Sequence, residues 1–66
     1  MKKMSDLVSG AYFSFGEEKS VYHVDRIVYS GNRNGDFIVY YYNIDTLKDF
    51  IWNTKQYNSV IYIYPN

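Results

Sequence analysis

The 66-residue chain contains no cysteine, a single histidine, a single proline, and no excess charge of either sign. Without cysteine it can form neither a disulfide nor a cysteine-based zinc site, so packing or association must stabilise this single domain, residues 1–66. Seven basic residues balance seven acidic ones, which argues against a nucleic-acid-binding protein and against an acidic DNA mimic. The apolar runs are far shorter than the ~20 residues of a membrane-spanning helix, so no membrane association is expected.

The amino terminus and the codon preference give an expected location and source. Met1, Lys2 and Lys3 begin like a signal peptide, but Ser5 and Asp6 follow, and no apolar region appears. We therefore expect a protein that stays in the cytoplasm of a host cell. Tyr, Ile, Asn and Lys, which have AT-rich codons, greatly outnumber Gly, Ala, Arg and Pro. This bias indicates a low-GC bacterium, or a phage or mobile element that lives in one.

What the chain does contain is an abundance of aromatic residues, nine of them Tyr and four Phe. Alternating, β-branched and aromatic residues predict strands over 11–15, 21–30, 37–42 and 59–64. The second strand alternates imperfectly, and a bulge at Asp25-Arg26 would restore a single apolar face. Asn34-Gly35 between two such segments predicts a hairpin across residues 30–36.

The segment after the third strand has a different period. Ile44, Leu47, Phe50 and Ile51 recur at helical spacing, and Asn43 or Asp45 could cap the first turn, so we expect a helix over residues 45–52. The element order is then β-β-β-α-β, an α+β fold with one helix packed on a small antiparallel sheet. The alternative is a small bent barrel of the SH3-like kind, in which the helix plugs one end.

One short helix can cover only one face of a four-stranded sheet, yet the last two strands are apolar on both faces. The face away from the helix would carry Ile38, Tyr40, Tyr42, Val60, Tyr62 and Tyr64. Tyrosine is enriched at interfaces, and exposed apolar patches mark interaction sites. We therefore expect a homodimer, a partner site, or both. The alternative is a sheet that curls so tightly that both faces are partly internal.

The candidates for catalysis and metal binding are weak. His23, Asp25 and Arg26 could supply a base, its orienting carboxylate and an anion-binding group, but no nucleophile or ligand set accompanies them. Asp45 and Asp49 lie four residues apart, and a helix cap explains Asp45 more simply than a cation does. We expect no catalytic residues, no metal and no cofactor, and hence no enzyme.

The function expected from these observations is that of a small interaction protein. In size and composition the chain resembles small phage proteins that bind and disable a host enzyme, which implies an accessory protein that blocks a host protein by occupying its surface. Two alternatives remain: a binder of a small anionic or nucleotide ligand at a dimer interface, and a sheet that binds single-stranded nucleic acid. The expected partner-binding residues are Arg33, Tyr40, Tyr42, Trp52, Tyr62 and Tyr64.

Overall fold

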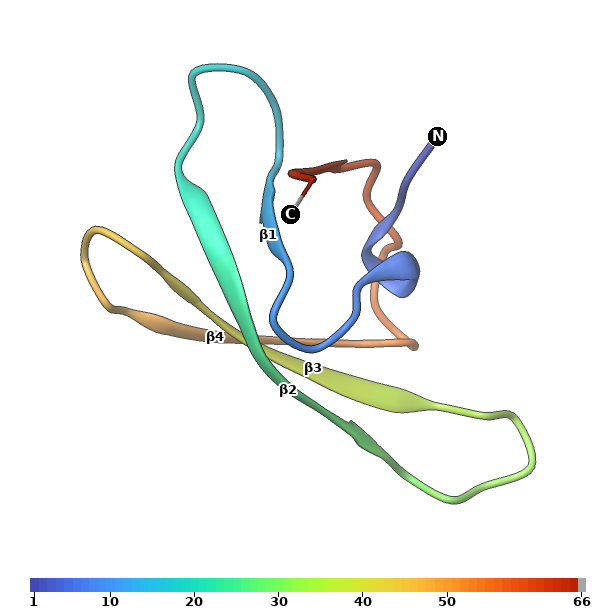
Figure 1. Cartoon of the computed structure of the whole chain (residues 1–66). Helices are drawn as coiled ribbons and strands as arrows, with labels where there is room; N and C mark the ends of the chain where they lie inside the picture. Colours follow the sequence, from blue (N-terminus) through green and yellow to red (C-terminus); the bar gives the residue numbers. More distant parts are fainter. Residues whose placement is uncertain (66) are drawn as a thin grey trace.

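The computed structural model describes residues 1–65, which form one five-stranded antiparallel sheet preceded by a short 3-10 helix. The elements are η1 (Met4–Asp6), β1 (Tyr12–Ser14), β2 (Val21–Tyr29), β3 (Phe37–Asn43), β4 (Asp49–Asn53) and β5 (Tyr62–Ile63). The strands lie in the order β4-β3-β2-β1-β5. The β2–β3 and β3–β4 hairpins project in opposite directions, as Figure 1 shows.

The long strand β2 bends at a β-bulge. Val24 lies opposite Tyr41 and Arg26 lies opposite Tyr40, so Asp25 is an extra residue without a partner on β3. This confirms the bulge predicted from the imperfect alternation. The bulge brings Tyr22, Val24, Ile27 and Tyr29 to the same side of β2, where the first three join the core and Tyr29 stays 70% exposed at the end of the strand.

The β2–β3 hairpin also confirms the prediction from Asn34-Gly35. Ser30 N donates to Asp36 O at 2.9 Å and closes the loop, while Gly35 has a φ of 71°. Glycine adopts this left-handed conformation without the steric cost that a Cβ atom would impose. The loop therefore fixes β2 and β3 as antiparallel neighbours over the full length of β3.

The expected helix over residues 45–52 is wrong, because the chain makes a tight turn there and returns as β4. Asn43 N donates to Lys48 O at 3.0 Å, and Leu47 N donates to Asn43 O at 2.8 Å. Leu47 has a φ of 62°, which no residue inside a right-handed helix adopts. Within residues 1–65 no helix reaches seven residues, so the protein is almost all-β and the α+β assignment is also wrong.

The side chain of Asn43 explains why this turn resembles a helix start in the sequence. Its Oδ1 accepts hydrogen bonds from the backbone nitrogens of Asp45 at 2.8 Å and Thr46 at 3.0 Å. A helix cap makes the same kind of bond, but so does an Asx turn, and here the turn is not continued. The residues that follow alternate as in a strand, with Phe50 and Trp52 inward and Ile51 outward.

The last strand and the amino-terminal turn lie side by side. β5 pairs with β1, and Val60 forms an isolated bridge with Lys3. Met4 N donates to Ser59 O at 3.1 Å, and the two segments are adjacent in Figure 1. The 3-10 helix Met4–Asp6 begins after Lys3, whose backbone N donates to Asp6 Oδ2 at 2.9 Å.

No helix in residues 1–65 covers the sheet, so the core is enclosed by the bent sheet itself. The sheet bends around the core, as Figure 1 shows. The alternative of a bent barrel plugged by a helix is also wrong, because within residues 1–65 no pairing of β4 with β5 closes the sheet and no helix plugs it. The buried apolar residues are Met4, Leu7, Ala11, Phe13, Val24, Val39, Tyr41, Trp52 and Ile61. Partly buried rings of Tyr22, Phe37 and Phe50 pack against them. The prediction that alternate residues of the third and last strands face away from the core is confirmed. These residues are Ile38, Tyr40, Tyr42, Val60, Tyr62 and Tyr64.

Candidate functional site

A row of aromatic side chains crosses the outer side of the sheet. Tyr12 on β1 lies opposite His23 on β2, and His23 lies opposite Tyr42 on β3. The ring centroids are 4.4 Å apart for Tyr12 and His23, and 5.4 Å apart for His23 and Tyr42. Tyr64 extends the row, because its N donates to Tyr12 O at 2.9 Å. Three strands, β1, β2 and β3, therefore contribute to the row of rings, and Tyr64, which follows β5, lies beside Tyr12.

Arg26 and Tyr40 lie beside this row on the same side of the sheet. The guanidinium carbon of Arg26 is 4.1 Å from the centroid of the Tyr40 ring, a cation–π contact. The bulge makes this contact possible, because it turns Arg26 to the same side as His23. We call the whole surface the outer tyrosine face; its residues are Tyr12, His23, Arg26, Tyr40, Tyr42, Tyr62 and Tyr64.

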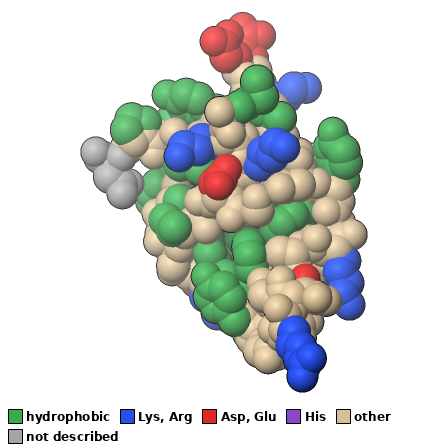
Figure 2. Space-filling view, turned by 90° about the vertical axis from the view of Figure 1, so that its right-hand side faces the viewer, with side chains coloured by type: hydrophobic (Ala, Val, Ile, Leu, Met, Phe, Trp, Pro, Cys, Tyr) green, Lys and Arg blue, Asp and Glu red, His purple; other side chains and the backbone are tan. Residues whose placement is uncertain are grey.

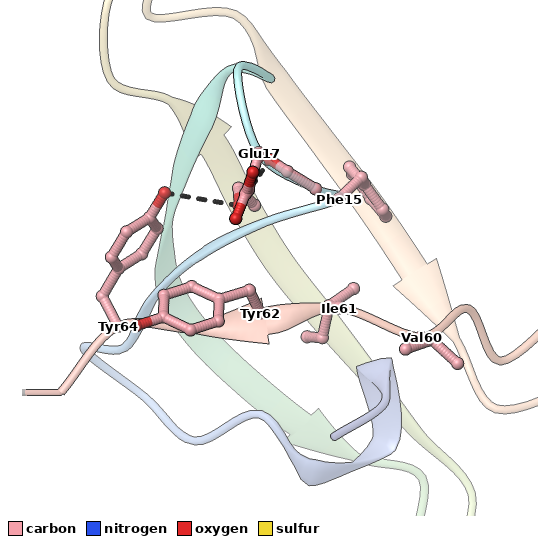
Figure 3. A pocket seen from close by; sticks show the side chains of 8 residues that line it. Phe15, Glu17, Val60, Ile61, Tyr62 and Tyr64 are labelled. Atoms are coloured by element: carbon pink, nitrogen blue, oxygen red, sulfur yellow. Dashed lines mark hydrogen bonds between the residues drawn. The ribbon is translucent and has the colours of Figure 1, made fainter. Parts of the chain in front are cut away.

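The β5 end of this face borders a pocket of about 470 Å³. The rings of Tyr62 and Tyr64 stand edge to face with centroids 4.8 Å apart, and Tyr64 Oη donates to Ser14 Oγ at 3.4 Å. In Figure 3 the segment that carries Phe15 and Glu17 lies across from these tyrosines. The pocket is lined by Ser14, Phe15, Gly16, Glu17, Val60, Ile61, Tyr62 and Tyr64.

A second pocket, of about 420 Å³, lies at the β4 side of the face and has a mixed charge. Its lining includes one basic residue, Arg26, and two acidic residues, Asp25 and Asp49. Arg26 Nη1 is 3.3 Å from Asp25 Oδ2, and both side chains are about 60% exposed, so solvent screens this ion pair. An anion entering this pocket would meet two carboxylates and an arginine that already has a partner.

His23 does not have the surroundings of a general base. Its Nδ1 is buried and makes no hydrogen bond, and Asp25 is paired with Arg26 rather than with the imidazole. A carboxylate bonded to Nδ1 is what would orient a catalytic histidine. The ring instead packs between Tyr12 and Tyr42 as part of the aromatic row.

The structure places the predicted partner-binding residues in three locations: the outer tyrosine face, the 30–36 loop and the core. Tyr40, Tyr42, Tyr62 and Tyr64 share the outer tyrosine face. Arg33 is exposed in the 30–36 loop, and no strand pairing or ring contact joins it to those tyrosines.

Trp52 was expected at the surface, and this is wrong, because its side chain lies in the core at 7% exposure. Three members of the face were not among the predicted partner-binding residues: Tyr12, His23 and Arg26. Tyr12 could have been found, since it alternates with Phe13 on the predicted first strand.

The 30–36 loop that carries Arg33 is held by Asp36. Asn32 Nδ2 donates to Asp36 Oδ2 at 2.9 Å, and Thr54 Oγ1 donates to Asp36 Oδ1 at 2.8 Å. These hydrogen bonds favour the ionised carboxylate and lower the pKa of Asp36 below its usual 3.8. Asp36 therefore joins the loop to the end of β4 and leaves Arg33 as the projecting charge.

No group of three or more His, Asp or Glu side chains is placed to hold a metal ion in residues 1–65. Asp45 lies in the β3–β4 turn and Asp49 begins β4, so the expected helix cap is wrong as well. No helix in this range is long and apolar enough to cross a membrane.

The comparisons with known proteins give no relative for this chain. No protein-family model matches it, and neither a curated protein nor a solved structure gives a match. The arrangement of residues on the outer tyrosine face therefore carries the functional argument.

Proposed function

We propose that this protein is a non-catalytic interaction protein that binds a host protein through the outer tyrosine face. It would act in the cytoplasm of the host as an accessory protein of a phage or mobile element, and would block its target sterically. The observation that carries the proposal is the aromatic row Tyr12–His23–Tyr42 on the paired strands β1, β2 and β3, with Tyr64 beside Tyr12. Rigid aromatic side chains on a fixed scaffold offer large contact area with little loss of conformational entropy.

The charges of the face favour a protein partner over an anionic one. Arg26 is stacked on Tyr40 and paired with Asp25, while Asp49 adds a second carboxylate to the same pocket. A nucleic acid or nucleotide would need a net positive site for its phosphates. Figure 2 shows another side of the molecule, on which basic and acidic side chains are interspersed. These features favour a protein surface over a phosphate-bearing ligand.

The proposal predicts that truncating tyrosines of the face weakens partner capture. Tyr62 is 54% exposed on the face, and Tyr57 is 85% exposed outside it, so they form a matched pair. The immobilised protein would be incubated with lysates of low-GC bacteria, and captured proteins would be compared among the wild type, Tyr62→Ala, Tyr42→Ala and Tyr57→Ala. We expect one partner to be retained by the wild type and Tyr57→Ala, and to bind at least ~1 kcal/mol more weakly to the other two.

Two controls make this result interpretable. Circular dichroism melts establish that each variant is folded before capture is compared. Capture should change little between low and moderate salt, because a neutral chain releases few counterions. Co-purification of nucleic acid with a steep loss of binding at higher salt would contradict the proposal and favour the nucleic-acid-binding alternative.

A further inference from the structure

The outer edge of β4 has hydrogen-bonding groups that point away from the sheet. Asn43 N donates to Lys48 O, and Thr54 N donates to Phe37 O, which fixes the alternation of bonded pairs along the β3–β4 ladder. In an antiparallel ladder every second residue directs its N–H and C=O away from its neighbour. Asp49, Ile51 and Asn53 are therefore the residues of β4 that face outward.

Only part of this edge is open. Asn53 is occupied, because its N donates to Gln56 Oε1 at 2.8 Å and its O accepts from Gln56 N at 2.9 Å. The outward N–H and C=O groups of Asp49 and Ile51 have no such partner in the described part of the chain. Ile51 also exposes 57% of its surface. Two outward residues, one charged and one apolar, thus form a short free edge.

The opposite edge of the sheet is partly covered by the chain itself, at Ile61 but not at Ile63. Tyr64 N donates to Tyr12 O, so the same alternation makes Ile61 and Ile63 the outward residues next to β5. Ile61 N donates to Lys2 O at 2.9 Å, and the bridge between Lys3 and Val60 continues this cover. Within residues 1–65, β4 thus has two outward residues whose N–H and C=O groups lack partners, Asp49 and Ile51, whereas the opposite edge has one, Ile63.

We propose that a second copy of this chain pairs with β4, antiparallel and about a two-fold axis that passes beside Phe50. In this register Asp49 of one copy lies opposite Ile51 of the other. The outward N–H and C=O groups of Asp49 and Ile51 in each copy are then all hydrogen-bonded to the other copy. The ladder ends where the free edge ends, because Asn53 is already occupied and Leu47 lies in the turn. This inference does not depend on the proposed partner.

The side chains are compatible with this register. The Phe50 rings of the two copies meet on the inner side as a close, non-hydrogen-bonded pair, the arrangement in which aromatic side chains interact best. No residue meets a like charge directly, because Asp49 faces Ile51 and Lys48 faces Trp52. On the outer side, Tyr40 and Tyr42 of both copies join one continuous sheet surface, so the dimer doubles the outer tyrosine face.

Sedimentation equilibrium of the wild type and of three variants tests this interface. Ile51→Pro removes one outward N–H without touching the bonds to β3, and proline is tolerated on edge strands. Ile51→Val keeps the N–H, and Tyr62→Glu places a charge on the outer tyrosine face. We expect a dimer for the wild type, for Ile51→Val and for Tyr62→Glu, and a dissociation constant raised at least tenfold for Ile51→Pro.

Amide hydrogen exchange of the wild type gives a second measurement that requires no variant. Exchange of the Asp49 and Ile51 amides should slow as the protein concentration is raised, because these amides become bonded in the dimer. A wild type that stays monomeric at millimolar concentration would overturn the inference. A dimer that Tyr62→Glu dissociates, with the Asp49 and Ile51 amides exchanging at a constant rate, would overturn it too and place the contact on the outer tyrosine face.

Discussion

The indole Nε1 of Trp52 donates a hydrogen bond to the backbone oxygen of Tyr57 at 2.8 Å. This bond ties the connection between β4 and β5 to the core, in which the Trp52 ring packs at 6.1 Å from the Phe37 ring. The only tryptophan of the chain is therefore a core residue that holds this connection in place.

Replacing Trp52 by phenylalanine should lower the free energy of unfolding by about 1–3 kcal/mol. The variant leaves the Tyr57 oxygen without its donor and leaves part of the indole volume empty. Urea titration followed by circular dichroism measures the change. Tyr57→Ala is the matched control, because the bond uses the backbone of Tyr57 and its side chain is exposed; equal losses in the two variants would contradict this account.

Replacing Leu47 by glycine should stabilise the protein by roughly 0.5–1 kcal/mol. Leu47 has a φ of 62° and is 69% exposed, so glycine relieves backbone strain and removes few contacts. In a helix the same substitution would destabilise by about 1 kcal/mol. The sign of the change in a thermal or urea melt therefore separates the observed turn from the helix that the sequence pattern predicts.

Stability at alkaline pH should depend on Tyr41. Burial raises the pKa of the Tyr41 hydroxyl above 10.0. A group whose pKa is raised on folding stabilises the folded state fully below its unfolded pKa, and this contribution is lost as the pH rises through the folded pKa. We expect Tyr41→Phe to shift the midpoint of alkaline unfolding to higher pH, as followed by circular dichroism. An unchanged midpoint would show that Tyr41 does not control this transition.

Stability at acid pH should depend on Asp36 with the opposite sign. Its pKa is lowered by hydrogen bonds from Asn32 and Thr54, so its contribution is present above the usual carboxyl pKa and is lost as the pH falls through the folded value. Asp36→Asn should flatten the decrease of the melting temperature below about pH 4. Asp49→Asn is the control, since the Asp49 side chain makes no hydrogen bond within residues 1–65.

Local patterns were sufficient to predict the central part of the sheet. Strand β2, its bulge and the hairpin to β3 follow from β-branched and aromatic residues and from Asn34-Gly35, features that act over a few residues. The sidedness of Tyr40 and Tyr42 followed from alternation alone. These predictions succeeded because local preference and tertiary packing agree there.

The prediction failed where two local patterns compete. Ile44, Leu47, Phe50 and Ile51 fit a helical period, but Phe50, Ile51 and Trp52 are consecutive aromatic and β-branched residues, which favour strands. The neighbouring strand β3 decides between them, because its edge offers a ladder that residues 49–53 can complete. Sequence patterns could not place Trp52 either, because its burial depends on that same pairing.

The position of β5 beside β1 has a consequence for the order of folding. Short turns join β2, β3 and β4, so these strands can pair while the rest of the chain is still unfolded. The pairing of Phe13 with Ile63 instead closes a loop that spans about three quarters of the chain, and a longer loop loses more conformational entropy on closure. The β2–β3–β4 meander is therefore the expected nucleus, and the two ends of the chain come together last.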